Sequence, residues 1–115
     1  MPVIRYADLQ RKDVDMEGVK DATRVEVIGG PEGWQENVMR VFRLGPGGYT
    51  PRHQHDWEHV NHVISGRGKL RIGDTVHDLG EKDFALVPPN TEHQFENPFD
   101  EPFEFICIVP NRGNY

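Results

Sequence analysis

The sequence is short of the features that mark secreted, membrane and nucleic-acid-binding proteins. It has one cysteine, Cys107, among 115 residues, so no internal disulfide can form. It has no apolar run of about 18 residues, the length of a membrane span, and residues 1–10 lack a signal-peptide pattern. The 13 Lys and Arg against 19 Asp and Glu give a net charge of -6, which argues against an anionic partner surface. We therefore expect a cytoplasmic protein that binds neither nucleic acid nor membrane.

Glycine and proline, by contrast, are well represented. The 12 Gly and 9 Pro, with 36% hydrophobic and 28% charged residues, suit a compact β protein with many turns. The length suits one hydrophobic core. Residues 1–23 mix charges with isolated apolar positions, and we interpret them as an N-terminal arm or edge strand. Residues 24–115 are predicted to form the β-barrel domain.

Short strand-like segments follow one another along this predicted domain. They are residues 24–28, 37–44, 60–65, 69–72, 75–79, 83–87 and 103–109. Clusters of Gly, Pro, Asn or Asp separate most of them, and the cluster at 45–48 is expected to end the second strand. Strands of this length, with turns about every ten residues, predict an all-β sandwich or closed antiparallel barrel.

Histidines are concentrated in one part of the chain. Four of the six lie within residues 52–62, RHQHDWEHVNH. In a strand, His53 and His55 share a face about 6.6 Å apart, from a rise of about 3.3 Å per residue. A turn over residues 56–58 would bring His59 back beside them. Neutral imidazoles bind a divalent metal at about 2.0–2.1 Å from several directions, so this spacing predicts a metal site.

A helical interpretation of the same segment is also available. His55, His59 and His62 fall at i, i+4 and i+7, on one face of a helix. It is the weaker interpretation, because Pro51 precedes the segment, Gly66 follows it, and it has no H-E-x-x-H pattern. A lone histidine is usually a surface or hydrogen-bonded core residue; we expect His62 to be a surface or interface residue and His77 to be solvated.

The spacing around the histidines resembles the first motif of the cupin superfamily, G-x5-H-x-H-x3,4-E-x6-G. The residues that carry this resemblance are Gly47, His53, His55, His59 and Gly66. One position departs from the motif, since His59 stands where cupins usually have Glu.

A second stretch is similar to the second cupin motif, G-x5-P-x-G-x2-H-x3-N, through Pro88, His93 and Asn97. Lys82 and Asn90 stand where that motif has its two glycines. Asn tolerates a positive φ angle better than most residues, so the turn before His93 can be retained.

The resemblance implies a small antiparallel β-barrel or jelly roll of double Greek-key form, commonly a homodimer. It implies one divalent transition-metal ion per chain, held by His53, His55, His59 and His93. The all-histidine set is similar to that of small single-domain cupins such as a thermophilic bacterial manganese cupin. Mn or Fe is favoured by this resemblance, while Cu, Ni and Zn also suit imidazole. Four neutral ligands would leave the ion its full charge, making it a strong Lewis acid.

Alternation along the expected strands gives a candidate substrate pocket, lined by Arg40, Trp57, Asn61, Phe95, Phe105 and Cys107. If Arg40 faces inward, its guanidinium could hold a carboxylate, although surface exposure is commoner for arginine. Trp57 could gate the pocket or pack on its rim. Cys107 is interpreted as a small core residue, because no base lies beside it in the sequence.

The function expected from these observations is a metal-dependent oxidoreductase, dioxygenase-like, acting on an unknown small molecule. One alternative is a metal-dependent isomerase or lyase that uses Lewis acidity. Another is a non-catalytic cupin module that binds a small ligand. Because the fold supports all three, enzymatic activity itself stays open and no catalytic residue is assigned.

Overall fold

The computed structural model describes residues 2–114; residues 1 and 115, the outermost residues of the predicted arm and barrel, lie outside the described part. The strands are β1 (Lys12–Asp13), β2 (Lys20–Ile28), β3 (Asn37–Tyr49), β4 (His59–Ser65), β5 (Gly68–Ile72), β6 (Thr75–Leu79), β7 (Phe84–Val87), β8 (His93–Glu96) and β9 (Phe103–Pro110). The 3-10 turns are η1 (Tyr6–Asp8), η2 (Gly30–Glu32) and η3 (Asn111–Gly113). No helix in residues 2–114 is long and apolar enough to cross a bilayer.

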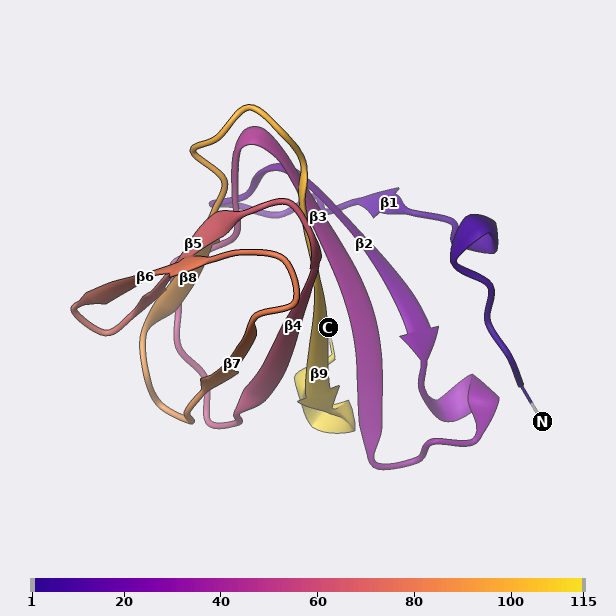
Figure 1. Cartoon of the computed structure of the whole chain (residues 1–115). Coiled ribbons are helices and arrows are strands. Elements are labelled where there is room, and N and C mark those ends of the chain that lie inside the picture. Colours follow the sequence, from indigo (N-terminus) through magenta and orange to yellow (C-terminus); the bar gives the residue numbers. More distant parts are fainter. Residues whose placement is uncertain (1, 115) are drawn as a thin grey trace.

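The strands form one curled sheet in which the described pairings are antiparallel. The order is β6-β5-β8-β3-β9-β4-β7, with β2 beside β3 and β1 beside β2. Figure 1 shows the sheet curling so that β5, β6 and β8 lie across the barrel from β2 and β3. This arrangement confirms the predicted small antiparallel barrel.

The glycine-rich cluster at 45–48 bends a strand rather than ending it, so the expectation of a strand end there was wrong. Strand β3 continues through the cluster, leaving β9 and joining β8. The Gly47 amide, at φ 79°, donates to the Asn97 carbonyl at 2.8 Å. A Cβ at Gly48 would lie 2.8 Å from the Asp21 carbonyl oxygen, so neighbouring backbone fills that space. Small residues let β3 turn this corner.

The apolar core fills the barrel next to the histidines. Its buried members are Ala22, Leu44, Val63, Leu70, Leu79, Val87, Phe95, Phe103 and Phe105. The rings of Phe95 and Phe105 stack with centroids 4.2 Å apart, and both rings also line the cavity described below. The core therefore forms one wall of the candidate site, and its close packing restricts the side chains of that wall.

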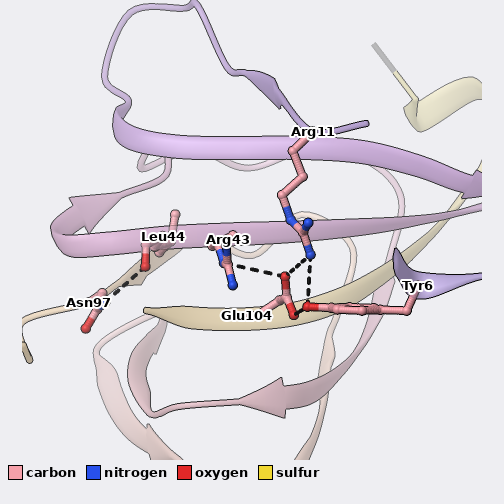
Figure 2. Close-up of polar contacts among 6 residues, drawn as sticks. All are labelled: Tyr6, Arg11, Arg43, Leu44, Asn97 and Glu104. Atoms are coloured by element: carbon pink, nitrogen blue, oxygen red, sulfur yellow. Dashed lines mark hydrogen bonds and ion pairs between the residues drawn. The ribbon is translucent and has the colours of Figure 1, made fainter. Parts of the chain in front are cut away.

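The N-terminal arm is attached to the barrel by a buried carboxylate, shown in Figure 2. Glu104, on β9, is fully buried and accepts hydrogen bonds from the Tyr6 hydroxyl and from Arg11 Nη2, the latter at 2.5 Å. Arg43 Nε lies 3.6 Å from the same carboxylate. Two cations and a hydroxyl thus compensate the buried charge and hold the arm on the sheet.

Candidate metal centre

Four histidines reach the same point from three parts of the chain. His59 is the first residue of β4 and His93 the first of β8, while His53 and His55 lie on the extended segment before β4. Two backbone hydrogen bonds join His53 and His93, at 2.9 and 3.2 Å. This bridge fixes the two motif segments side by side, although they are far apart in the sequence.

The side chains converge as well as the backbones. One ring nitrogen from each of His53, His55 and His93 lies within 4.8 Å of the others. His59 Nε2 lies 3.1 Å from His93 Nε2. Two nitrogens bound at about 2.1 Å to one ion, at a right angle, would be about 3 Å apart. The nitrogens of His53, His55 and His93 are therefore spaced so that one ion could contact all three, and His59 adjoins this group through His93.

Backbone carbonyls orient two of these rings. His55 Nδ1 donates to the Trp57 carbonyl at 3.0 Å, and His93 Nδ1 donates to the Thr91 carbonyl at 2.9 Å. Because a carbonyl oxygen only accepts, each Nδ1 carries the ring proton. Each Nε2 is then left with a lone pair, the form in which histidine binds a metal.

An amide orients the third ring in the same way. Asn61 Nδ2 donates to the Ile106 carbonyl at 3.2 Å, which turns Oδ1 toward His59 Nδ1 at 2.9 Å. His59 Nε2 therefore also carries a lone pair. It lies 3.1 Å from His93 Nε2, which also carries a lone pair, and two lone pairs this close repel unless the nitrogens share a proton or bind a common metal ion. The donor set thus fits a metal ion.

Burial keeps these imidazoles neutral. Burial lowers the pKa of His53, His59 and His93 to about 4, and it also lowers the pKa of His55. The positive charge of Arg40 lowers the pKa of His55 and His59 further. At neutral pH the four rings are accordingly unprotonated and free to act as ligands.

A cavity of about 70 Å³, open to solvent, adjoins the four rings. It is lined by Val14, Met16, Val19, Ala22, Arg24, Arg40, Phe42, Thr50, Pro51, His53, His55, Trp57, His59, His93, Phe95, Phe105, Cys107 and Gly113. The lining has many apolar side chains and, within residues 2–114, no carboxylate. A small ligand can therefore reach the ring nitrogens without displacing the core.

Five of the six predicted pocket residues lie on this cavity. They are Arg40, Trp57, Phe95, Phe105 and Cys107. Asn61 does not line it; it is buried behind His59 and orients that ring. Trp57 forms part of the wall, because its ring stacks on His55 at 4.2 Å with an interplanar angle of 5°. Cys107 is buried, which raises the pKa of its thiol and keeps it protonated.

The N-terminal arm supplies a part of the cavity that the sequence-based prediction missed. Val14, Met16 and Val19 line its mouth, and Arg24 and Phe42 contribute from β2 and β3. A signal for the first two was present, because Val14 and Met16 alternate with acidic residues over 13–17, as in a half-buried extended segment.

The other two histidines lie away from the site. His62 stacks on Phe84 with ring centroids 4.3 Å apart, and His77 is exposed on β6. Neither lines the cavity beside the ligand group. The exposure of His77 agrees with the expectation that it is solvated, whereas His62 is partly buried, with its ring packed on Phe84.

The two substituted glycine positions keep a glycine-like backbone. Lys82 has φ 70° and Asn90 has φ 58°, comparable to Gly66 at 76° and Gly47 at 79° in the first motif. The four motif glycine positions therefore share the left-handed conformation, whichever residue occupies them.

The sequence and the fold are similar to those of known proteins. The chain is 34% identical over 71 residues to a 1-methylthio-D-xylulose 5-phosphate methylsulfurylase from Rhodospirillum rubrum, covering 62% of this chain and 46% of that protein. The polyketide cyclase RemF from Streptomyces resistomycificus superposes with a TM-score of 0.89 at 27% identity, over 96% of this chain and 79% of RemF. A cupin-2 domain from Rhodospirillum rubrum gives a TM-score of 0.84 at 26% identity, over 96% and 74%.

A family model described as the cupin domain, Cupin_2, matches residues 40–109. That segment contains both histidine motifs and runs from the middle of β3 to the end of β9. The chain spans less than half the length of the methylsulfurylase, so the agreement concerns the domain rather than that whole protein. The antiparallel barrel, the histidine cluster and the family match lead to one conclusion: this chain belongs to the Cupin_2 family of cupin domains.

Proposed function

We propose that His53, His55, His59 and His93 bind one divalent transition-metal ion, with Mn or Fe favoured. The opposed Nε2 lone pairs of His59 and His93 are the observation that carries this proposal. The donor set contains imidazoles alone, so a bound ion would keep its full positive charge. Such an ion would supply Lewis acidity and, if redox-active, electrons for reaction with dioxygen.

The same site supports a metal-dependent oxidoreductase, of the dioxygenase kind, that acts on a small molecule. The cavity opens directly onto the four ring nitrogens, so a ligand can lie beside the ion. The chain's role is to hold the rings, to position the ligand and to limit water through apolar walls that include Phe42, Phe95 and Phe105. The substrate is an organic molecule small enough for this cavity.

Oxygen dependence tests this function. The untagged protein is loaded with Mn or Fe and incubated with a panel of small unsaturated and oxygenated compounds, with and without dioxygen. We expect consumption of dioxygen together with loss of one compound, and neither change in a metal-free His55→Ala control. Equal turnover under strictly anaerobic conditions would rule out the dioxygenase proposal.

The comparisons favour a second candidate, a metal-dependent isomerase, cyclase or lyase that acts without dioxygen. RemF is named a polyketide cyclase, and the Rhodospirillum rubrum relative is named a methylsulfurylase. Anaerobic turnover in the experiment above would support this candidate. No turnover across the panel, combined with thermal stabilisation by one of its compounds, would instead support a non-catalytic binding module.

A further inference from the structure

The cavity beside the histidines has an unbalanced charge. Its lining includes the guanidinium of Arg40 and, within residues 2–114, no Asp or Glu. A divalent ion on four neutral imidazoles would add two further positive charges. Charges of one sign in a partly desolvated cavity raise the free energy of the site unless an anion enters. The lining therefore favours a negatively charged ligand.

Arg40 is the group best placed to meet such a ligand. Its side chain projects from β3 into the cavity, yet the residue is only 7% exposed. Its Nε is buried and has no hydrogen-bond partner in the described residues. Its Nη2 donates to Cys107 Sγ at 3.3 Å, and sulfur is a weak acceptor. The flat guanidinium is also held over the Phe42 ring, with Cζ 5.1 Å from the ring centroid.

The protein does not neutralise this arginine itself. Glu26 lies directly opposite Arg40 in the β2–β3 register. Its Oε1, however, accepts a hydrogen bond from Asn114 Nδ2 at 2.7 Å, and the residue is exposed. The ion pairs within residues 2–114 do not include Arg40. A buried arginine with an unused Nε is costly unless a ligand completes its hydrogen bonds.

We propose that Arg40 binds the carboxylate of a small organic acid and places the rest of that ligand between the aromatic wall and the four histidines. Nε and Nη2 form one edge of the guanidinium, and that edge matches the two oxygens of a carboxylate. A phosphate group usually needs more donors, such as backbone amides at a helix N-terminus, and the apolar walls do not provide them. This substrate class deepens the proposed function, but the arginine site does not require the ion.

The test compares benzoate with its neutral analogue benzamide by calorimetry on the metal-loaded protein. We expect benzoate to bind at least about tenfold more tightly than benzamide. The reason is that neutral benzamide cannot form the charge-assisted hydrogen-bond pair that benzoate forms with the guanidinium. Arg40→Gln should remove most of this preference, and Arg40→Lys, which keeps the charge without the planar edge, should remove part of it. Glu26→Gln, the matched control on the facing strand, should keep the full preference.

Additional measurements distinguish a failure of the Arg40 proposal from a failure of the metal-site proposal. In a metal-free His93→Ala variant, the preference for benzoate should persist in weaker form and still depend on Arg40, even if the metal proposal fails. Equal binding of benzoate and benzamide by the wild-type protein would overturn the proposal, and so would an unchanged preference in folded Arg40→Gln protein. Tighter Arg40-dependent binding of inorganic phosphate than of benzoate would overturn the carboxylate class.

Discussion

The orientation of three of the four clustered histidine rings is set by the group on the far side of the ring. Three histidines donate their Nδ1 protons to fixed acceptors, two of them backbone carbonyls and one the side chain of Asn61. Backbone acceptors cannot be removed by substitution, but Asn61 can. This amide is therefore the most accessible test of whether ring orientation contributes to metal affinity.

Asn61→Ala should lower the affinity for the divalent ion by about 10–100-fold, because His59 loses the acceptor that fixes its tautomer. Competition with a chromogenic chelator measures this affinity. Asn114→Ala removes an amide that bonds to Glu26 away from the cavity, and it should leave the affinity unchanged. Wild-type affinity in folded Asn61→Ala protein would show that ring orientation does not depend on this amide.

Lys82 adopts a left-handed backbone conformation that costs a non-glycine residue about 1–2 kcal/mol. Lys82→Gly should therefore raise the free energy of unfolding, by about 0.5–1 kcal/mol after the greater flexibility of glycine in the unfolded chain is subtracted. Urea denaturation of the metal-free protein measures the change. Lys82→Ala keeps the Cβ and should give no gain, so equal stabilisation by both substitutions would contradict this explanation.

At the scale of elements, the N-terminal arm has two roles: it is bound to the barrel through Glu104, and it lines part of the cavity. Tyr6 and Arg11 hold the arm on Glu104 (Figure 2). The residues that follow them include Val14 and Met16, which line the cavity. The buried carboxylate thus fixes one wall of the site from outside the barrel.

Glu104→Gln should lower the free energy of unfolding by about 2 kcal/mol, because it leaves Arg11 and Arg43 without a counter-charge. Hydrogen exchange should show faster exchange across residues 5–19 than in the wild type. Lys69→Ala breaks an exposed ion pair with Asp78 and should change stability by less than about 0.5 kcal/mol. Unchanged exchange in the arm of Glu104→Gln would contradict the proposed attachment.

The strands were predictable where apolar alternation ends at a clear turn, as at residues 69–72 and 75–79 on either side of Gly73 and Asp74. Sequence alone could not show that the cluster at 45–48 continues β3, because glycine and proline favour a bend as well as a break. That choice depends on β8, which supplies partners for the bent strand. The arm itself was expected, but its place on the cavity was not, because the contacts of Val14, Met16 and Val19 depend on strands distant in the sequence.

At the scale of the whole molecule, the buried histidines link stability to pH. Their pKa values in the folded, metal-free protein are about 4 for His53, His59 and His93, below the ordinary value of 6.5. Well above pH 6.5 these rings are neutral in both the folded and the unfolded chain, so they do not lower the free energy of unfolding. As pH falls from 6.5 toward 4, the unfolded chain binds protons that the folded chain does not, so stability decreases.

Chemical denaturation of chelator-treated protein between pH 4 and 8 measures this dependence. We expect the free energy of unfolding to fall steadily below pH 6.5. His77→Ala, which changes an exposed histidine, should keep the same profile, whereas His59→Ala should flatten it. A wild-type profile that is flat between pH 4.5 and 6.5 would contradict the burial of neutral imidazoles.

The resemblance of the two motifs to cupin motifs pointed to histidines that lie close together in the structure, although only His53, His55 and His93 form a mutual cluster. The fold brings the two motif segments together, which explains why His59 Nε2 and His93 Nε2, 34 residues apart in the sequence, lie 3.1 Å from each other. Sequence could not show that their lone pairs oppose each other, since this depends on acceptors contributed by Asn61 and Thr91. The homodimer stays a prediction, and sedimentation velocity would test it by measuring the oligomeric state in solution.

The metal content of untagged protein tests the central claim most directly. Elemental analysis of the purified wild-type chain should find one divalent transition-metal ion per chain. His93→Ala should lose most of that ion, whereas His77→Ala should retain it. A folded His93→Ala protein that retains a full equivalent of metal, or a wild-type protein that binds no ion when Mn or Fe is supplied, would contradict the account.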